Sequence, residues 1–320
     1  MKAIAAYAYG GLDELKLVDV PVPTPGPDEV LVRVRAAGVN LVDTLIREGY
    51  GSTNEFPLIP GWDFAGVVEK VGQNVTNIPV GLDVYGYKVG SRQGTYAEYV
   101  TVPAAWVYRT PANLSYEEAA GVPCVGLTAY QTLVDRLNVQ AGETVLITAA
   151  AGGVGSVAVQ IAKALGAHVI ATASTRNLEY LRDLGADEVI DYTQGDWIET
   201  ARSLHPDGVD VVFTCIAGET KHQSPKVLRD GGRLAWISGE EKSGPPMERQ
   251  IQGTYSYGSP NQETFAVLTQ LIEEGRLKVP IEEVYPLQQA PRAQERVAAG
   301  DLQGKVRAGH VRGKLVITIQ

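Results

Sequence analysis

A glycine-rich turn in the middle of the chain is the segment with the clearest chemical meaning. An apolar strand is expected over Thr144–Ala149, and a helical pattern over Val154–Leu165 follows it. The turn between them reads Ala150-x-Gly152-x-x-Gly155, which matches the dinucleotide-binding fingerprint with Ala in place of the first Gly. The cofactor-binding residues predicted here are Gly152, Gly153, Val154 and Gly155.

Each glycine of this turn has a physical role in such a site. Gly152 would let the backbone approach a pyrophosphate, and Gly155 would let the helix pack closely on the strand. The helix N-terminus would offer unpaired N–H groups to the phosphates. The alternative is a tight strand-to-helix connection that binds no ligand.

The end of the second expected strand indicates which dinucleotide would bind. The strand His168–Ala173 runs into Ser174, Thr175 and Arg176, and no carboxylate follows it. An NAD site usually places Asp or Glu there to accept a hydrogen bond from the ribose 2′-hydroxyl. Ser174 and Arg176 can instead donate to a 2′-phosphate, so the sequence favours NADP(H). Alternatively, Arg176 is a solvated residue at the start of a helix.

The composition excludes several classes of protein. The 320 residues include 28 Lys and Arg against 37 Asp and Glu, and this acidic balance argues against a nucleic-acid partner. The sequence has no run of the ~20 apolar residues that a membrane span needs. Cys124 and Cys215 are far apart, which excludes a disulfide scaffold and a Cys-rich zinc lobe. With no secretory signal, we expect a soluble, cytoplasmic protein.

The pattern of expected elements predicts two domains. The first ~120 residues are predicted to form mainly β-strands, as the alternation of Val30, Val32 and Val34 indicates. From about Ala119 onward, expected strands and helices alternate. Short apolar strands with amphipathic helices between them indicate a doubly wound parallel sheet. The further elements expected are strands over Glu188–Ile190, Val209–Phe213, Arg233–Ser238 and Lys314–Ile319, and helices over Leu178–Leu184 and Thr264–Glu274.

Six motifs in order resemble one known family across essentially the whole chain. They are Ala37-Gly38-Val39-Asn40-x-x-Asp43, Pro60-Gly61-Trp62-Asp63-x-Ala65-Gly66, Gly94-x-Tyr96-Ala97-Glu98-Tyr99, Gly126-Leu127-Thr128-Ala129-Tyr130, Ala149-x-x-Gly152-x-x-Gly155 and Gly309-His310-x-Arg312-Gly313-Lys314. The sequence resembles the quinone oxidoreductase (zeta-crystallin-like) branch of the medium-chain dehydrogenase/reductases. The resemblance implies an α/β fold with a GroES-like catalytic domain (1–120 and 262–320), a Rossmann NADP(H)-binding domain (121–261), an active site in the cleft between them, and a homodimer.

The same resemblance addresses the question of a catalytic zinc ion. Zinc-dependent members carry Cys where this chain has Asn40, and His-Glu where it has Trp62-Asp63. Cys124 looks like the remaining Cys ligand, so only Asp63 and Cys124 could still bind a metal. A catalytic zinc usually has three protein ligands. We therefore expect no metal in the catalytic cleft.

An enzyme without a Lewis acid needs an acceptor that stabilises its own developing charge. Quinones and enones do so when a hydride is added to them, because they form a hydroquinone anion or an enolate. The prediction is an NADPH-dependent quinone oxidoreductase. The alternatives are an NADPH-dependent reductase of an activated C=C bond in an enone or enoyl substrate, and a catalytically silent protein that binds NADPH for a structural purpose.

The resemblance also suggests roles for individual residues. Asn40 would hydrogen-bond the substrate carbonyl or the nicotinamide ribose, unless it only caps the segment that follows; Asp43 would orient its neighbours. Tyr50 lies one residue from the position of a family tyrosine that faces the active site. Tyr255 and Tyr257 would line the cleft or lie in a surface loop, and no histidine is assigned to catalysis. The remaining cofactor contacts implied are Thr128, Tyr130, Tyr192, Ser238, Gly239 and Arg312.

Overall fold

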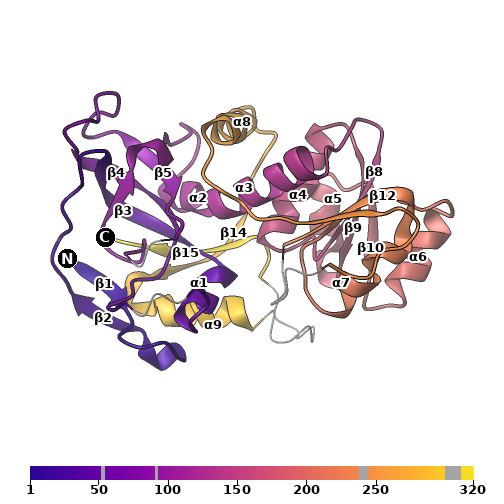
Figure 1. Cartoon of the computed structure of the whole chain (residues 1–320), viewed down its shortest axis with the longest axis horizontal. Helices are drawn as coiled ribbons and strands as arrows, with labels where there is room; N and C mark the ends of the chain where they lie inside the picture. The colour runs from indigo at the N-terminus through magenta and orange to yellow at the C-terminus, as the bar shows by residue number, and fades with distance from the viewer. Residues whose placement is uncertain (52–54, 91–92, 238–243, 300–310) are drawn as a thin grey trace.

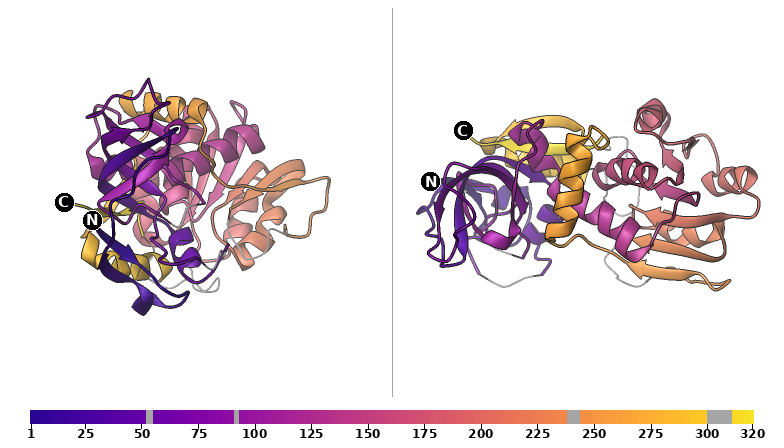
Figure 2. Two further views of the ribbon diagram at one scale, coloured as in Figure 1. Left: turned by 60° about the vertical axis from the view of Figure 1, so that its left-hand side comes forward. Right: turned by 90° about the horizontal axis from the view of Figure 1, so that it is seen from above.

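The chain folds into two lobes, each built around its own β-sheet (Figure 1). The computed structural model describes residues 1–51, 55–90, 93–237, 244–299 and 311–320. Both chain ends lie in the first lobe, and two further views show the same division (Figure 2). The predicted fold class, an α/β protein with a β-rich lobe and a doubly wound parallel sheet, is confirmed.

The first lobe contains a seven-stranded sheet whose main path has the order β14-β15-β3-β4-β5-β7, with β6 paired to β3. The alternation that predicted β3 is reflected in its burial, since Val30, Val32 and Val34 are all buried. Leu31 is buried as well, because β3 is a central strand covered on both faces. The strands are β3 (Glu29–Val39), β4 (Asp63–Val71), β5 (Asp83–Tyr87), β6 (Tyr99–Pro103), β7 (Val107–Arg109), β14 (Ile281–Pro286) and β15 (Lys314–Thr318), beside the separate pair β1 (Lys2–Ala5) and β2 (Lys16–Asp19).

The last strand of the chain returns to the first lobe. β15 pairs antiparallel with β3, in a register that places Leu315 opposite Val39 and Ile317 opposite Ala37. Leu315 and Ile317 are fully buried in the core of this lobe. The two ends of the chain therefore share one sheet. The predicted domain boundaries, after residues 120 and 261, stay a prediction.

The second lobe contains a six-stranded sheet of order β10-β9-β8-β11-β12-β13 in which every pair is parallel. This is the 3-2-1-4-5-6 order of a doubly wound fold, in which the strand order reverses between β8 and β11. β12 begins five residues before the predicted Arg233, and the predicted strand end at Ser238 lies outside the described residues. The strands are β8 (Thr144–Thr148), β9 (His168–Ala173), β10 (Glu188–Asp191), β11 (Val209–Thr214), β12 (Leu228–Trp236) and β13 (Gln252–Tyr255).

Helices connect these strands and join the lobes. Within the second lobe, α4 (Gly153–Ala164), α5 (Leu178–Asp183), α6 (Trp197–Leu204) and α7 (Glu219–Gln223) each lead from one strand toward the next. The short helices near the lobe junction were not predicted; they are α1 (Leu41–Arg47), α2 (Tyr116–Gly121) and α3 (Pro123–Gln131). α8 (Gln262–Glu273) packs on α3, and α9 (Ala290–Ala298) packs on α1. Among the described residues, no helix is both long and apolar enough to cross a membrane.

Candidate functional site

A cavity of ≈ 210 Å³ lies at the carboxyl edge of the parallel sheet. Its walls come from segments that follow consecutive strands: Gly152 after β8, Ser174 and Asn177 after β9, Tyr192 after β10 and Ile216 after β11. The strand order reverses between β8 and β11, and doubly wound sheets bind their ligands at such a switch point. The cavity is therefore the best candidate for a dinucleotide site.

The two outer glycines of the turn differ in what surrounds them. A Cβ at Gly155 would lie 2.6 Å from the carbonyl oxygen of Ala149 and from Cα of Ala150, so the contact between α4 and β8 requires glycine there. Among the described residues, a Cβ at Gly152 would meet only the carbonyl oxygen of Ala149, at 3.5 Å. Gly152 is the N-cap of α4, has no side-chain cap, and lines the cavity. The first backbone N–H groups of α4 therefore lie beside the cavity. An anion-binding site needs such donors, which have no partner within the helix.

Four of the predicted phosphate contacts lie together at one end of this cavity. The Tyr192 hydroxyl forms a hydrogen bond with Ser174. Burial raises the pKa of Tyr192, whereas that hydrogen bond and the nearby Arg176 charge act in the opposite direction. From the C-terminal segment, the Arg312 guanidinium donates to the carbonyl oxygen of Arg176 (3.0 Å) and to Oδ1 of Asn177 (3.1 Å). Two arginines and two hydroxyls thus lie near one another in this region.

A carboxylate that the sequence analysis did not consider also lies in this region. Asp191 ends β10, and its side chain accepts hydrogen bonds from the hydroxyls of Thr175 (2.5 Å) and Thr193 (2.6 Å). Burial raises the pKa of Asp191, but these hydrogen bonds outweigh that effect and the net shift is downward. Asp191 is therefore ionised, and its oxygens are occupied by the neighbouring threonines.

A buried polar network lies where the chain enters α1. The Asn40 side-chain amide donates to Oδ2 of Asp63 (2.9 Å), and the Lys314 ammonium donates to Oδ1 of Asn40 (2.5 Å). The same ammonium donates to the Val39 carbonyl oxygen (2.9 Å) and lies 3.4 Å from Oδ2 of Asp63. Asn40 is also the N-cap residue of α1, but its amide is directed to Asp63 and Lys314. Burial raises the pKa of Asp63, and the Lys314 charge opposes that shift.

Asp43 adjoins this network and is fully buried. Its Oδ2 accepts hydrogen bonds from the Asn40 backbone N–H (2.8 Å) and from the Tyr96 hydroxyl (2.9 Å), while its Oδ1 is buried with no partner among the described residues. Burial raises the pKa of Asp43 to about 7, and the negative charge of Asp63 adds to the shift. A group with this pKa carries a proton for a large part of the time at neutral pH. Asp43 thus contacts Asn40 and Tyr96 directly, and the orienting role expected of it stays a prediction.

The residues of this network do not fit a metal ion. Both oxygens of Asp63 are already engaged, by the Cys124 backbone N–H (2.8 Å) on one side and by Asn40 and Lys314 on the other. Burial raises the pKa of the Cys124 thiol to about 12, so it does not offer a thiolate. A divalent cation beside Asp63 would also meet the Lys314 ammonium at close range. In the described part of the chain, the side-chain ammonium group of Lys314, and not a set of metal ligands, therefore lies at this position.

Lys314 connects this network to the glycine turn. The preceding residue, Gly313, donates its N–H to the carbonyl oxygen of Ala151 (2.9 Å) and forms a β-bridge with Gly152. A Cβ at Gly153 would lie 3.2 Å from the methylene stem of Lys314. The residues Arg312 to Lys314 thus run along the glycine turn, from the Arg176 end of the cavity to the Asn40 network.

Three other predicted site residues, Tyr50, Thr128 and Tyr130, do not line the cavity. Tyr50 follows α1 and is 56% exposed. Thr128 is buried on α3, and Tyr130 is half-buried on the same helix. Ser238 and Gly239, also predicted to contact the cofactor, lie outside the described residues.

Sequence reasoning missed several residues of this region. Lys314 was quoted in a motif without a role, although a lysine that opens an otherwise apolar strand is a visible signal. Tyr96 was also quoted in a motif without a role, whereas its hydroxyl donates a hydrogen bond to Asp43. Asn177 and Trp197 line the cavity without having been singled out. Their neighbours come from distant parts of the chain, which single-sequence patterns do not reveal.

Comparison with known proteins agrees with this geometry. Residues 26–112 match the alcohol dehydrogenase GroES-like domain, and residues 184–317 match a family described as zinc-binding dehydrogenase. The chain is 35% identical over 312 residues to quinone oxidoreductase of Sus scrofa, covering 92% of this chain and 93% of that protein. It is 36% identical over 328 residues to the chloroplastic NADPH-dependent alkenal/one oxidoreductase of Arabidopsis thaliana, covering 99% and 79%.

A solved structure gives the same picture. The Escherichia coli quinone oxidoreductase complexed with NADPH superposes with a TM-score of 0.87 at 28% identity, covering 99% of this chain and all of that one. The likeness extends over both lobes.

The glycine turn generates a prediction that separates packing from binding. In Gly152→Val we expect a stable fold, because the backbone there is extended (φ −75°, ψ 178°) and the new side chain enters the cavity. Dinucleotide affinity should fall at least about tenfold. Gly155→Val should instead lower stability by roughly 1–3 kcal/mol or more through overlap with β8. Urea unfolding and NADPH fluorescence titration measure both; wild-type affinity in Gly152→Val would contradict the assignment.

The buried Asp43 predicts a pH-dependent stability. Between the ordinary Asp pKa of ~3.9 and about 7, the folded chain keeps a proton on Asp43 that the unfolded chain has released. The free energy of unfolding contributed by Asp43 therefore falls as pH rises through this window. The side chain in Asp43→Asn stays neutral at every pH. Between roughly pH 5 and pH 8, the free energy of unfolding of this variant should therefore fall by about 2–3 kcal/mol less than that of the wild type. The exposed Asp207→Asn is the matched control, and equal slopes for all three proteins would refute the prediction.

Proposed function

Because the chain belongs to the zinc-free quinone oxidoreductase branch of the medium-chain dehydrogenase/reductase superfamily, and is therefore an NAD(P)-dependent oxidoreductase, we propose that it reduces quinones with NADPH. The hydride would pass from the nicotinamide to the quinone, and a proton would complete the hydroquinone. Support for NADPH comes from the group formed by Ser174, Arg176, Tyr192 and Arg312. The related E. coli enzyme was solved with NADPH.

The proposal rests on the position of the Lys314 ammonium group in the buried network. This group holds Asn40 and Asp63 where a metal would otherwise supply Lewis-acid catalysis. Reduction of a simple ketone or aldehyde develops charge on one oxygen and depends on such stabilisation. A quinone spreads the charge over its ring, so it can accept a hydride without that assistance. The residues present are therefore suited to an acceptor of this class.

Each group of residues has a distinct part in this scheme. The N–H groups at the start of α4 would hold the pyrophosphate, and the Ser174–Arg176 segment would hold the 2′-phosphate. When bound, the nicotinamide supplies the hydride. Asn40 and Asp43 would fix the backbone where α1 begins, and the exposed Tyr50 would place its hydroxyl toward the acceptor oxygen. Tyr255 and Tyr257 would offer ring faces to a planar acceptor.

The second candidate is reduction of an activated C=C bond. The similarity to the Arabidopsis alkenal/one oxidoreductase favours it, and an enolate, like a hydroquinone anion, needs no metal.

The homodimer also remains a proposal. Its candidate surface is the outer edge of β13, the last strand of the parallel sheet, and sedimentation velocity would measure it.

A panel of acceptors tests the function. We expect oxidation of NADPH, followed at 340 nm, with quinones, slower oxidation with enones, and none with simple aldehydes. A chelator should leave the quinone rate unchanged. Faster turnover of enones would favour the second candidate, and turnover of aldehydes that a chelator abolishes would refute a metal-free reaction. NADPH binding without turnover of any acceptor would indicate a catalytically silent protein.

The cofactor preference has its own test. Arg176→Ala should raise KM for NADPH by roughly tenfold or more, the equivalent of ~1.5–3 kcal/mol, and change KM for NADH little. The reason is that only NADPH carries the 2′-phosphate that the guanidinium would bind. The exposed Arg182→Ala on α5 is the matched control. Equal effects of Arg176→Ala on both cofactors would show that this arginine does not bind the phosphate.

A further inference from the structure

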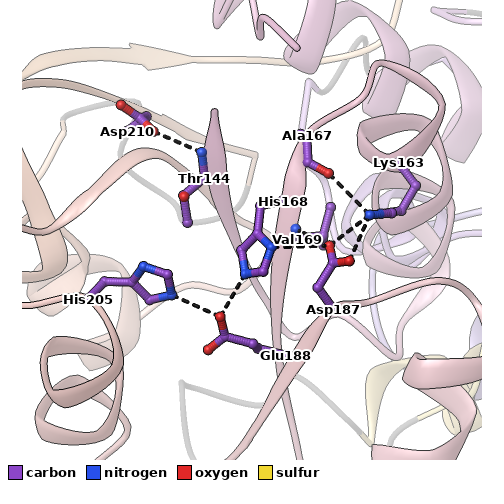
Figure 3. Close-up of polar contacts among 9 residues, drawn as sticks. All are labelled: Thr144, Lys163, Ala167, His168, Val169, Asp187, Glu188, His205 and Asp210. Atoms are coloured by element: carbon purple, nitrogen blue, oxygen red, sulfur yellow. Dashed lines mark hydrogen bonds and ion pairs between the residues drawn. The ribbon is translucent and has the colours of Figure 1, made fainter. Parts of the chain in front are cut away.

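Two histidines and a glutamate meet at the amino edge of the parallel sheet (Figure 3). Nε2 of His168 lies 2.6 Å from Oε1 of Glu188, and Nε2 of His205 lies 3.0 Å from the same oxygen. The three ligand atoms all lie within 4.8 Å of one another. The side chains of His168, Glu188 and His205 are 40%, 27% and 22% exposed, so the cluster is open to solvent.

The fold brings these residues together from separate segments. His168 is the first residue of β9 and Glu188 the first residue of β10. The parallel register pairs Glu188 with Ile170, so His168, two positions earlier, projects from the same face of the sheet. His205 is the C-cap of α6, the helix that packs against β10. The cluster therefore lies at the opposite edge of the sheet from the cavity.

We propose that His168, Glu188 and His205 bind a divalent first-row transition-metal ion such as Zn²⁺. Two imidazole nitrogens and one carboxylate oxygen form a ligand set that zinc uses in proteins. A tetrahedral ion with bonds of about 2.0–2.1 Å places its ligand atoms roughly 3.3 Å apart. The present distances of 2.6 and 3.0 Å need to widen only slightly, which side-chain rotation can provide. A fourth position remains for water.

A second observation points to a ligand at this place. Oε2 of Glu188 is buried and has no hydrogen-bond partner in the part of the chain that the structure describes, although its residue is partly exposed. Buried carboxylate oxygens normally have a partner, and a metal ion is one that would satisfy Glu188.

The carboxylate of Asp187 lies near the second ring nitrogen of His168. Oδ2 of Asp187 lies 3.7 Å from Nδ1 of His168, on the side of the ring away from Glu188. Asp187 is itself fixed by the Lys163 ammonium (2.8 Å) and the Val169 backbone N–H (2.7 Å). Metal-binding histidines commonly direct their other ring nitrogen toward a carboxylate, which orients the ring. Asp187 is positioned to do this for His168.

A bound ion would fasten α6 to the sheet. Its ligands come from β9, β10 and the end of α6, and the other end of α6 begins with Trp197, which lines the cavity. The ion would therefore restrain a helix that contributes to the cavity wall. The metal-site proposal does not rest on the proposed reaction, since none of its three ligands is among the described residues that line the cavity.

Metal binding to the purified full-length protein tests the proposal. After treatment with EDTA and removal of the chelator, we expect one Zn²⁺ per chain in competition with a chromophoric zinc chelator, and a higher Tm with Zn²⁺ than without. His205→Ala and Glu188→Gln should each weaken binding at least about tenfold. The exposed His222→Ala on α7 is the matched control and should bind as the wild type does.

Two results would overturn the proposal. One is wild-type protein that binds no Zn²⁺ in the competition assay; the other is equal affinity in the wild type, His205→Ala and Glu188→Gln. Circular dichroism and NADPH titration of each metal-free variant establish that it is folded. Should a variant fail to fold, Co²⁺ added to the wild type gives a separate readout. Visible absorption bands of four- or five-coordinate Co²⁺ support the site, and a spectrum of hexa-aqua Co²⁺ alone refutes it.

Discussion

The ion pair between Lys314 and Asp63 is the constraint on which the arrangement of the candidate site depends. Asp63 is fully buried and Lys314 is 3% exposed, so neither charge has access to bulk water. Such groups lose several kcal/mol of hydration each, and the pair is tolerated only when hydrogen bonds compensate. Here the Asn40 amide, the Val39 carbonyl and the Cys124 N–H provide them. The pair therefore fixes the ends of β3, β4 and β15 together with the start of α3.

The charge balance of this region follows from the same constraint. Two carboxylates, Asp43 and Asp63, lie close to a single ammonium group, and both have a raised pKa. Ionisation of both would leave a net negative charge in a buried space. With Asp43 protonated, Asp63 and Lys314 neutralise each other. The cluster is thus electrically balanced without any further cation, which gives a physical reason why a metal ion would gain little at this position.

The sequence predicted those features that depend on local patterns. β9 was predicted to the residue, and β8 and α4 to within one residue, because apolar runs and helical spacing are local signals. The network around Lys314 could not be predicted in this way, since 251 positions separate Lys314 from Asp63. Only the return of the last strand to β3 brings them together. The clustering of Arg312 with Asn177 depends on the same return.

The histidine cluster was within reach of the sequence, and its omission is instructive. The expected strands His168–Ala173 and Glu188–Ile190 both begin with a ligand-type residue, and neighbouring parallel strands begin at the same edge of a sheet. Doubly wound folds bind their cofactors at the carboxyl edge of the sheet, so a search for catalytic residues does not consider the amino edge. In this chain the two edges carry different chemistry. Backbone N–H groups and hydroxyls suited to phosphate gather at one edge, while imidazoles and a carboxylate suited to a metal ion gather at the other, with α6 running between them.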